Sequence, residues 1–465
     1  MYDYDVLSIG AGTGGCASSM RSADLGKKVG LIEERKNGTG GTCVNRGCIP
    51  TKAMLRSAQI YTEAKEASKY GVNVSDVSLD MKTVHQKKQQ AVMGLKFGLD
   101  NMLLKPRGID RIQGRAKIID GHTVEVTNGK DVKQITAENI VIATGSEPAK
   151  IPAFHIDGKK IITSDEALNL KEIPNEMIIV GGGAIGLEFT SLFSTFGSKV
   201  TVVEMMPHLI PAMHEKEITD EVEKYIKDTG VTIKCGAGIR EINVKEDGRV
   251  ACILENDEVI EADMALVAIG RKLNTKDMGI EEAGIELTER GQIKINEEMR
   301  TSVPSIFAVG DITQGPQLSH KAQKQALVAA EIIAGNESKM NYDVIPSAIF
   351  MNPEVAMVGM TQEDAKKAGI DTIAGKMNFT SNEKALAMQK TTGAIKVVAR
   401  KDDHKIIGGQ IFGEEASILI EEIATAMENE LTLENVADSI HAHPTLSEIV
   451  METCKKALGR AFHKN

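Results

Sequence analysis

The chain has 465 residues, 42% of them hydrophobic, and a formal net charge of −10. This length predicts about three domains, and the acidic balance argues against a nucleic-acid partner, because phosphate binding needs a basic surface. An apolar strand follows soon after Met1 and no apolar run is long enough to span a bilayer, so we expect no signal peptide, no membrane partner and a cytoplasmic location.

The first predicted element is a strand that leads into a glycine-rich turn. Residues 5–9 read DVLSI and are followed by GAGTGG, which places Gly10, Gly12 and Gly15 in G-x-G-x-x-G register before a helical stretch. A second apolar strand ends at Glu33, close to the roughly 20-residue spacing at which an acid reaches a ribose hydroxyl. Because such glycines allow close backbone approach and the helix N-terminus offers amides to a pyrophosphate, this segment predicts a dinucleotide-binding unit.

A pair of cysteines follows this unit, in the sequence GGTCVNRGCIPTK. We expect Cys43 and Cys48 on the first turn or so of one helix, with some distortion, because a five-residue step slightly exceeds a helical turn. The helix N-terminus and nearby cations would lower the thiol pKa, which favours a redox-active pair. Half of a zinc site is the alternative, but no second pair at ligand spacing completes it.

The remaining four cysteines are scattered, in a chain without the features of a secreted disulfide framework. We interpret them as small buried hydrophobic residues in a reducing compartment. They are Cys16, Cys235, Cys252 and Cys454.

The glycine pattern recurs downstream. Residues 177–180 run into GGGAIG, which places Gly181, Gly183 and Gly186 in the same register, and the next strand ends at Glu204 with the same spacing as in the first unit. One such pattern often marks an ordinary turn of an α/β sheet, whereas two copies with matching flanks predict two dinucleotides. A carboxylate at this position accepts the ribose hydroxyls of NAD and repels the extra phosphate of NADP, so we expect NAD here.

Apolar strands that end in small residues mark the domain exits, at residues 140–148 and 265–275, and residues 301–313 form a further strand and turn that ends near Asp311. From Tyr342 onward, short strands alternate with helices and no glycine fingerprint is present. We predict an α/β fold with two Rossmann-like dinucleotide-binding domains and a C-terminal α+β dimerisation domain. The predicted segments are 1–148 (first dinucleotide domain with the redox cysteines), 149–272 (second dinucleotide domain), 273–341 (return to the first domain) and 342–465 (interface domain).

Near the C-terminus, the sequence HAHPTLSE contains His441, His443 and Glu448. An imidazole that moves protons near neutral pH needs an orienting carboxylate, and thiol–disulfide exchange needs such a base. A His-Pro turn alone is more often a surface loop. Its occurrence in a chain with a candidate redox pair favours a catalytic histidine.

Six blocks in this order resemble the pyridine nucleotide-disulfide oxidoreductase family over essentially the whole chain: GGTCVNRGCIPTK, ATGSEP, VGGGAIGLEF, AIGRKLNT, SIFAVGDIT and HAHPTLSE. Smaller signs are similar to the branch that oxidises dihydrolipoamide with NAD+. Ile185 stands where glutathione-reducing members tend to carry an aromatic residue, and Leu446 also resembles the lipoamide branch. The C-terminal sequence GRAFHKN lacks the extra redox pair of the mercuric and large thioredoxin reductases.

The resemblance implies a role for each catalytic residue. Cys48 would face the flavin and Cys43 would exchange with the substrate disulfide. Lys52 and Glu188 would form an ion pair beside the hydride-accepting flavin nitrogen. His443 would be the general base, oriented by Glu448. In this family the C-terminal domain supplies that base to the partner subunit, which implies an obligate homodimer.

The resemblance also implies FAD and NAD as cofactors and no metal, with Glu33 on the FAD ribose and Asp311 on the ribityl chain. The implied FAD contacts are Gly10, Gly12, Gly15, Glu33, Gly41, Thr42, Lys52, Gly114, Ala116, Thr144, Gly145, Ser146, Asp311, Leu318 and Ala322. The implied NAD contacts are Gly181, Gly183, Ala184, Ile185, Gly186, Glu188, Glu204 and Gly270.

The segment GPQLSHKAQKQA departs from the family pattern at Gln317 and Ser319, which bears on the flavin and on substrate choice. The expected reaction is oxidation of dihydrolipoamide, free or protein-bound, with reduction of NAD+. An NADH-dependent reductase of another disulfide, or a diaphorase or NADH oxidase with regulatory cysteines, stays open. A purely non-catalytic subunit is disfavoured by the complete glycine loops. Lipoamide enzymes of this family serve 2-oxoacid dehydrogenase or glycine-cleavage complexes, and the sequence does not say which applies.

Overall fold

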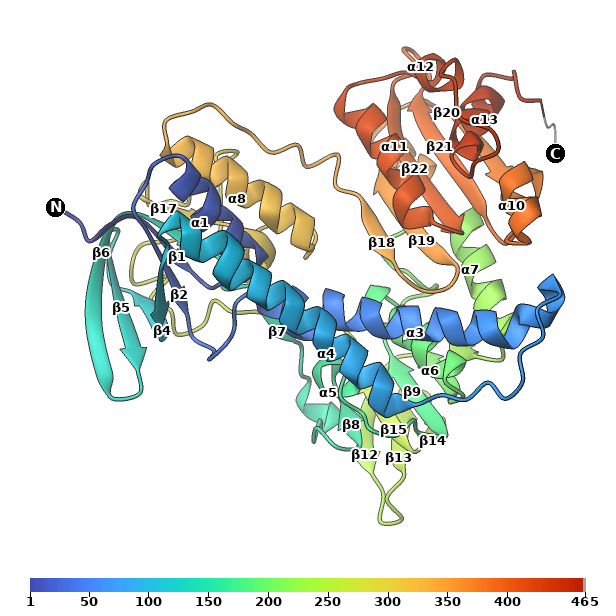
Figure 1. The fold of residues 1–465 in the computed structure, drawn as a ribbon, viewed down its shortest axis with the longest axis horizontal. Helices are drawn as coiled ribbons and strands as arrows, with labels where there is room; N and C mark the ends of the chain where they lie inside the picture. Colours follow the sequence, from blue (N-terminus) through green and yellow to red (C-terminus); the bar gives the residue numbers. More distant parts are fainter. Residues whose placement is uncertain (463–465) are drawn as a thin grey trace. The chain divides into compact units, whose positions relative to one another are not determined.

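The structure, a computed structural model, describes residues 1–462 and divides into two compact units, each built from separate stretches of the chain (Figure 1). The first unit contains residues 1–53, 82–149 and 270–340. The second contains residues 54–81, 150–269 and the described chain from residue 341 onward.

A parallel sheet forms the centre of the first unit. Its strands, in spatial order, are β3 (Asp110–Gln113), β2 (Val29–Glu33), β1 (Tyr4–Ile9), β6 (Asp131–Ile142) and β17 (Ile306–Ala308). The first half of β6 also pairs with an antiparallel hairpin, β4 (Arg115–Ile118) and β5 (Thr123–Asn128). This one long strand therefore belongs to both the nucleotide sheet and the hairpin beside it.

The central strands β1, β2 and β17 are buried on both faces, which explains why they are largely apolar, whereas the edge strand β3 is mostly exposed. Along β1, Val6 packs on one face, while Leu7 and Ile9 belong to the apolar cluster of the other face. Helices α1 (Thr13–Asp24) and α8 (Ser319–Ile333) lie side by side and contribute to the first of these clusters (Figure 1). Four of the candidate flavin residues lie at or beside their N-terminal ends: Gly12, Gly15, Leu318 and Ala322.

The other elements of this unit are short or lie outside the sheet. They are α2 (Gly41–Arg46), the beginning of α3 (Cys48–Glu66), α4 (Met81–Phe97), η2 (Gly98–Leu104), η3 (Lys105–Arg107), β7 (Ser146–Pro148), its antiparallel partner β16 (Arg271–Leu273) and η5 (Gly310–Ile312).

The second unit contains a second parallel sheet and an antiparallel one. The parallel strands, in spatial order, are β11 (Thr232–Lys234), β10 (Lys199–Val203), β9 (Glu176–Val180), β15 (Met264–Val267) and β8 (Ile161–Ile162). Its helices are α5 (Ser164–Ala167), α6 (Ala184–Thr195) and α7 (Lys216–Asp228). Two short 3-10 helices also belong to this unit: η4 (Pro152–Phe154) and η1 (Ala67–Tyr70), which directly follows α3.

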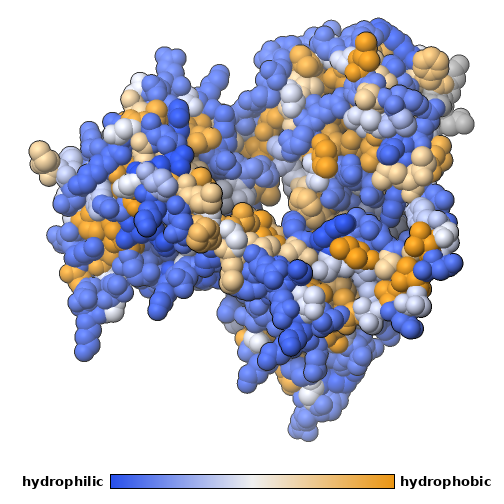
Figure 2. Space-filling view, in the orientation of Figure 1, coloured by the Kyte–Doolittle hydropathy of each residue, from blue (hydrophilic) through white to orange (hydrophobic). Residues whose placement is uncertain are grey.

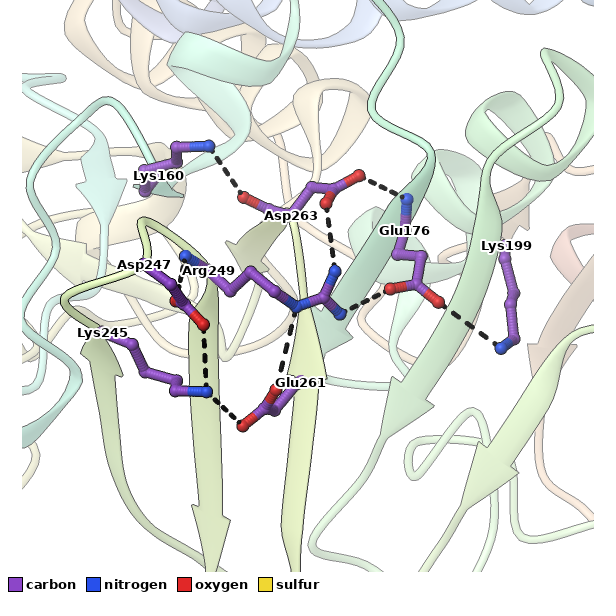
Figure 3. Close-up of polar contacts among 8 residues, drawn as sticks. All are labelled: Lys160, Glu176, Lys199, Lys245, Asp247, Arg249, Glu261 and Asp263. Atoms are coloured by element: carbon purple, nitrogen blue, oxygen red, sulfur yellow. Dashed lines mark hydrogen bonds and ion pairs between the residues drawn. The ribbon is translucent and has the colours of Figure 1, made fainter.

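A three-stranded meander is tied to this parallel sheet by an ion-pair network around Arg249 (Figure 3). The meander consists of β12 (Ile239–Val244), β13 (Val250–Leu254) and β14 (Val259–Ala262). The Arg249 guanidinium lies 2.5 Å from Glu176 of β9, 3.4 Å from Asp263 and 3.8 Å from Glu261 of β14. These side chains are about one-third exposed, so the network orients the meander more than it stabilises the fold.

The C-terminal part of the second unit is an antiparallel sheet with helices on it. Its strands, in spatial order, are β18 (Ser347–Ile349), β19 (Glu354–Gly359), β22 (Ile406–Gly413), β21 (Ala394–Arg400) and β20 (Thr372–Asn378). Its helices are α9 (Gln362–Lys367), η6 (Phe379–Ser381), α10 (Glu383–Met388), α11 (Ala416–Glu428), α12 (Leu433–Ala437) and α13 (Glu448–Ala457). Apolar residues of α11, such as Leu419 and Ile423, belong to the same buried cluster as Ile411 of β22. The predicted α+β architecture after Tyr342 agrees with this arrangement.

On the face drawn in Figure 2, hydrophilic residues predominate and hydrophobic ones form small separate groups. Among residues 1–462, no helix combines the length and apolar character needed to cross a membrane.

Candidate functional site

The first glycine loop joins β1 to α1, and two of its three predicted glycines, Gly10 and Gly15, leave no room for a side chain. Gly10 has φ +98°, and a Cβ there would lie 2.5 Å from the carbonyl oxygen of Ala143. A Cβ at Gly15 would overlap the carbonyl oxygen of Gly10. Gly12 differs, because a Cβ there would meet only the Cα of Gly41, at 3.9 Å. A side chain at Gly12 would therefore meet no close obstacle in the chain itself.

Glu33 lies beside this loop, as its spacing predicts. Its Oε2 accepts a hydrogen bond from the amide of Ala11 at 2.9 Å, and its Oε1 accepts one from the amide of Arg35 at 2.8 Å. Gly114 is a neighbour, since its amide donates to the carbonyl of Glu33 at 3.0 Å, and Ala116 lies in β4. The carboxylate is thus held at the end of β2 by backbone amides.

The second loop, between β9 and α6, repeats this geometry. Gly181 has φ +109°, and a Cβ there would lie 2.5 Å from the carbonyl oxygen of Ala268, while a Cβ at Gly186 would overlap the carbonyl oxygen of Gly181. A Cβ at Gly183 would meet nothing within 4 Å. Glu204 accepts hydrogen bonds from the amide of Gly182 at 2.6 Å and of Met206 at 2.7 Å.

Both loops meet the physical requirements for a pyrophosphate. Helix α1 begins directly after Gly12, and α6 begins directly after Gly183, with Ala184 and Ile185 as its first two residues. Neither helix N-terminus has a side-chain cap. The first amides of each helix therefore remain available to an anion that approaches through the open glycine.

The cysteine pair lies on two helices, which corrects our expectation of a single helical turn. Cys43 is in α2 and Cys48 is the first residue of α3, with Gly47 between them at φ −137° and ψ −110°. This break accommodates the five-residue step that one helix turn cannot. A Cβ at Gly41 would lie 2.5 Å from the Cα of Gly12, so α2, which includes Thr42, starts directly against the first glycine loop.

Both side chains are half-buried. A hydrogen bond from Cys48 is the largest influence on Cys43, and it lowers the pKa of that thiol to about 6 against the opposing effect of burial; hydrogen bonding by Ser319 and the charge of Lys52 contribute in the same direction. The Ser319 hydroxyl also lies 2.7 Å from that of Thr13. The lowered pKa favours the thiolate of Cys43, which is the nucleophilic form.

The other cysteines are inert by comparison. Burial raises the pKa of Cys16 to about 11 and the pKa values of Cys235, Cys252 and Cys454 to about 12. Three of them are buried as expected, whereas Cys235 is half-buried just after β11. Within residues 1–462, no group of three or more His, Cys, Asp or Glu side chains could hold a metal ion.

The remaining candidate flavin residues of the first unit gather at the ends of β6 and β17. Ser146 donates to the Asp311 carboxylate at 2.5 Å and accepts from Arg271 at 2.7 Å. Lys321 is buried, and its ammonium donates to the carbonyls of Gly310 at 3.1 Å and Gln314 at 3.0 Å; burial lowers its pKa to about 8. Sequence reasoning missed this lysine, which shares the buried face of α8 with Gln325 one turn further on.

Further predicted residues lie in the same segments. Thr144 donates its hydroxyl to the carbonyl of Asn274 at 2.7 Å, and Gly145 accepts from the Asn274 amide at 3.0 Å. Leu318 is the N-cap of α8 and accepts the first helical bond from Ala322 at 3.1 Å.

In the second unit, His443 and Glu448 meet as predicted. The Nδ1 atom of His443 lies 3.1 Å from the Glu448 carboxylate, whose hydrogen bond raises the histidine pKa. Burial opposes ionisation of Glu448, but hydrogen bonds from the Thr445 amide, at 2.7 Å, and from His443 outweigh it and lower the carboxylate pKa. His441 pairs instead with Glu422, at 2.7 Å.

The structure divides the predicted catalytic residues between the units. Cys43, Cys48 and Lys52 belong to the first unit. The second contains His443, Glu448 and the buried Glu188, which accepts a hydrogen bond from the Phe350 amide at 3.1 Å. Gly270, with φ +116°, follows β15 and opens the return to the first unit.

Comparison with known proteins gives the same family along the whole chain. The family model described as pyridine nucleotide-disulphide oxidoreductase matches residues 4–326, and the model of that family's dimerisation domain matches residues 345–454. The chain is 41% identical to a dihydrolipoyl dehydrogenase of Geobacillus stearothermophilus and 38% identical to one of Bacillus subtilis. Each match covers 99% of this chain and at least 97% of the relative.

Two solved structures share the fold. LpdA from Mycobacterium tuberculosis superposes with a TM-score of 0.90 at 25% identity, and the HOCl-induced flavoprotein disulfide reductase RclA from Escherichia coli with 0.85 at 29% identity. Each alignment covers 97% of this chain and 99% of the other. The predicted fold class and family are therefore confirmed, and the chain belongs to the pyridine nucleotide-disulphide oxidoreductase family, with that family's C-terminal dimerisation domain.

Proposed function

We propose that this protein is a dihydrolipoyl dehydrogenase, an FAD-dependent enzyme that oxidises dihydrolipoamide to lipoamide and reduces NAD+ to NADH. The observation that carries this proposal is the Cys43–Cys48 pair, which begins directly after the first glycine loop and contains a thiol with a pKa of about 6. Full-length similarity to dihydrolipoyl dehydrogenases supports the choice of substrate and the expected cofactors, FAD and NAD.

The residues of the first unit fit FAD. The open N-terminus at Gly12 suits the pyrophosphate, Glu33 is held where it can accept ribose hydroxyls, and Asp311 lies in the polar group with Ser146. Gly183 and Glu204 offer the same features to NAD in the second unit. The chemistry that bound FAD and NAD+ supply is two-electron transfer, which restores the disulfide of the cysteine pair.

We infer that Cys43 reacts with the substrate. A dihydrolipoamide thiol gives its proton to His443, and the resulting thiolate attacks Cys43 of the oxidised pair, which breaks the Cys43–Cys48 bond and leaves Cys48 as a thiolate. After His443 has passed the first proton to solvent, it accepts the proton of the second substrate thiol. The resulting thiolate attacks the substrate sulfur of the mixed disulfide, which forms lipoamide and releases Cys43 as a thiolate. A leaving thiolate with a low pKa departs quickly, so the lowered pKa of Cys43 serves this second step.

His443 is suited to the proton transfer. Glu448 approaches its Nδ1 atom, so Nε2 is the nitrogen that accepts the substrate proton. The pKa raised by the carboxylate makes the imidazole a stronger base. The dimerisation domain, with the family resemblance, supports a homodimer in which each subunit supplies His443 and Glu448 to its partner.

We further propose the segment roles given by the sequence, with 1–148 and 273–341 holding FAD, 149–272 holding NAD and 342–465 forming the dimer. The proposed site of action is the cytoplasm, and the proposed substrate carrier is a lipoyl-bearing component of a 2-oxoacid dehydrogenase or glycine-cleavage complex. Similarity to dihydrolipoyl dehydrogenases over 99% of the chain supports these assignments. Turnover with purified lipoyl domains of each complex would distinguish the carriers.

The first experiment is steady-state turnover with dihydrolipoamide and NAD+, beside NADPH with glutathione disulfide. We expect rapid NADH formation in the first assay and no turnover in the second. Weak activity in both would contradict the substrate assignment and favour another disulfide, with the segment around Gln317 and Ser319 as the first place to examine.

A further inference from the structure

The His443 ring lies near two carboxylates. Its Nδ1 atom is 3.1 Å from Glu448, the partner that the sequence predicts, and 3.3 Å from Glu383 Oε2. Glu383 is the first residue of α10, far from the HAHPTLSE block in sequence. Nothing in that block points to a second acid, so only the folded chain brings the two together.

A buried asparagine fixes α10 to the histidine loop. Asn382, only 5% exposed, accepts a hydrogen bond from the Ala385 amide at 2.9 Å and donates its side-chain amide to the carbonyl of Thr445 at 3.1 Å. The Thr445 amide in turn donates to Glu448 at 2.7 Å. The start of α10 and both partners of the His443–Glu448 pair are therefore parts of one hydrogen-bonded frame.

We propose that Glu383 is a positioning residue for His443, a second carboxylate whose charge lies beside the Nδ1 atom that bonds to Glu448 and stabilises the ring in its protonated form. The inference rests on the proposed function, because it assigns Glu383 to the work of the general base. It adds a group outside the HAHPTLSE block to the proton-transfer machinery.

The charges around the pair determine the sign of the effect. The hydrogen bond and charge of Glu448 are the main causes that raise the His443 pKa, and the charge of Glu383 acts in the same direction. The charge of His441, itself paired with Glu422, acts on Glu448 and lowers its pKa. Removal of Glu383 leaves Glu448 in place, so the His443 pKa falls but stays raised by its main partner.

A merely structural role for Glu383 is the rival explanation, because an acid in the first turn stabilises a helix through its dipole. Two variants separate the roles. Glu383→Gln keeps the side-chain length and removes the charge, whereas Glu383→Asp keeps the charge at the helix start and withdraws it from the ring by one methylene group. Glu421→Gln, which removes an exposed carboxylate from α11, is the matched control.

The experiment measures the pKa of His443 in the purified holoenzyme without substrates, from the pH dependence of deuterium exchange at the imidazole Cε1 carbon, read by mass spectrometry. We expect Glu383→Gln and Glu383→Asp to lower the midpoint, with a roughly two- to fivefold change in the protonation constant, the size of an exposed ion pair. Glu448→Gln should have a larger effect and Glu421→Gln none. A native midpoint in Glu383→Gln, or full rescue by Glu383→Asp, would overturn the proposal.

Kinetics give the second readout. Because the base works in its neutral form, a lower pKa should move the acid limb of the kcat/KM profile for dihydrolipoamide to lower pH in Glu383→Gln, with a modest fall of the plateau. An acid limb at its native position in that variant would contradict the proposal. If the native enzyme shows no dihydrolipoamide turnover, the proposed function fails, while the exchange midpoint still tests the Glu383–His443 interaction by itself.

Discussion

The turn from Gly10 to Gly15 and the turn from Gly181 to Gly186 share one backbone solution. In each, the first glycine has a positive φ and a Cβ there would lie 2.5 Å from a carbonyl oxygen of a neighbouring segment, and the last glycine admits no Cβ. In each, a glutamate near the end of the next strand accepts hydrogen bonds from two backbone amides. Each loop therefore fits a dinucleotide, and the loops by themselves do not distinguish which cofactor each would hold.

The two regions differ in the residues on the C-terminal side of each glutamate. After Glu33 the chain reaches Gly41, which packs against Gly12, and then the cysteine pair. After Glu204 come Met205 and Met206, both exposed. The fold thus provides two equivalent nucleotide sites, and the residues added beside the first one provide the sulfur chemistry.

The largest effect should come from a methyl group at the last glycine of either loop. Gly15→Ala should yield protein without bound FAD, and Gly186→Ala should retain FAD and lose about 100-fold or more in kcat/KM for NAD+, because a displacement of about 1 Å at a site can cost that much. Flavin absorbance and steady-state kinetics measure both. Gly94→Ala in α4, where a Cβ meets nothing within 4 Å, is the control. If Gly186→Ala lost FAD while Gly15→Ala retained it, the assignment of FAD to the first loop and NAD to the second would be wrong.

Replacing either glutamate should have a smaller effect, and each replacement should affect only one of the two cofactors. Glu204→Ala should raise KM for NAD+ roughly 10- to 100-fold, because hydrogen bonds to charged groups contribute about 1.5–3 kcal/mol, and it should reduce the preference over NADP+. Glu33→Ala should weaken FAD retention and leave KM for NAD+ unchanged. Equal effects of both variants on KM for NAD+ would contradict the assignment.

The smallest predicted effect is a change in the pKa of Cys43 when Ser319 is replaced. The alkylation rate of reduced Cys43 by iodoacetamide should rise with pH to a midpoint near pH 6, because the thiolate reacts and its pKa is about 6. Ser319→Ala should move that midpoint to higher pH by less than about one unit, since Ser319 is one of several groups that lower the pKa. A midpoint of about pH 8.5 in the native protein, which is the pKa of an ordinary cysteine, would contradict the lowered pKa of Cys43.

Local patterns predicted the parts of the site that depend on neighbouring residues. The glycine registers, the spacing to Glu33 and Glu204, and the short step from His443 to Glu448 reflect backbone requirements that the sequence displays directly. The break at Gly47 was missed because the sequence does not show where a helix restarts. The contacts of Ser319 with Cys43 and of Glu383 with His443 join distant segments, and only tertiary packing creates them.

The most direct test of the central claim is turnover by Cys48→Ser, with dihydrolipoamide and NAD+ in one assay and NADH with an artificial dye in the other. The account predicts that dihydrolipoamide oxidation is lost, because the disulfide of the pair cannot form, while dye reduction survives at the flavin. Full dihydrolipoamide turnover in this variant would contradict the account and would mean that the cysteines are regulatory.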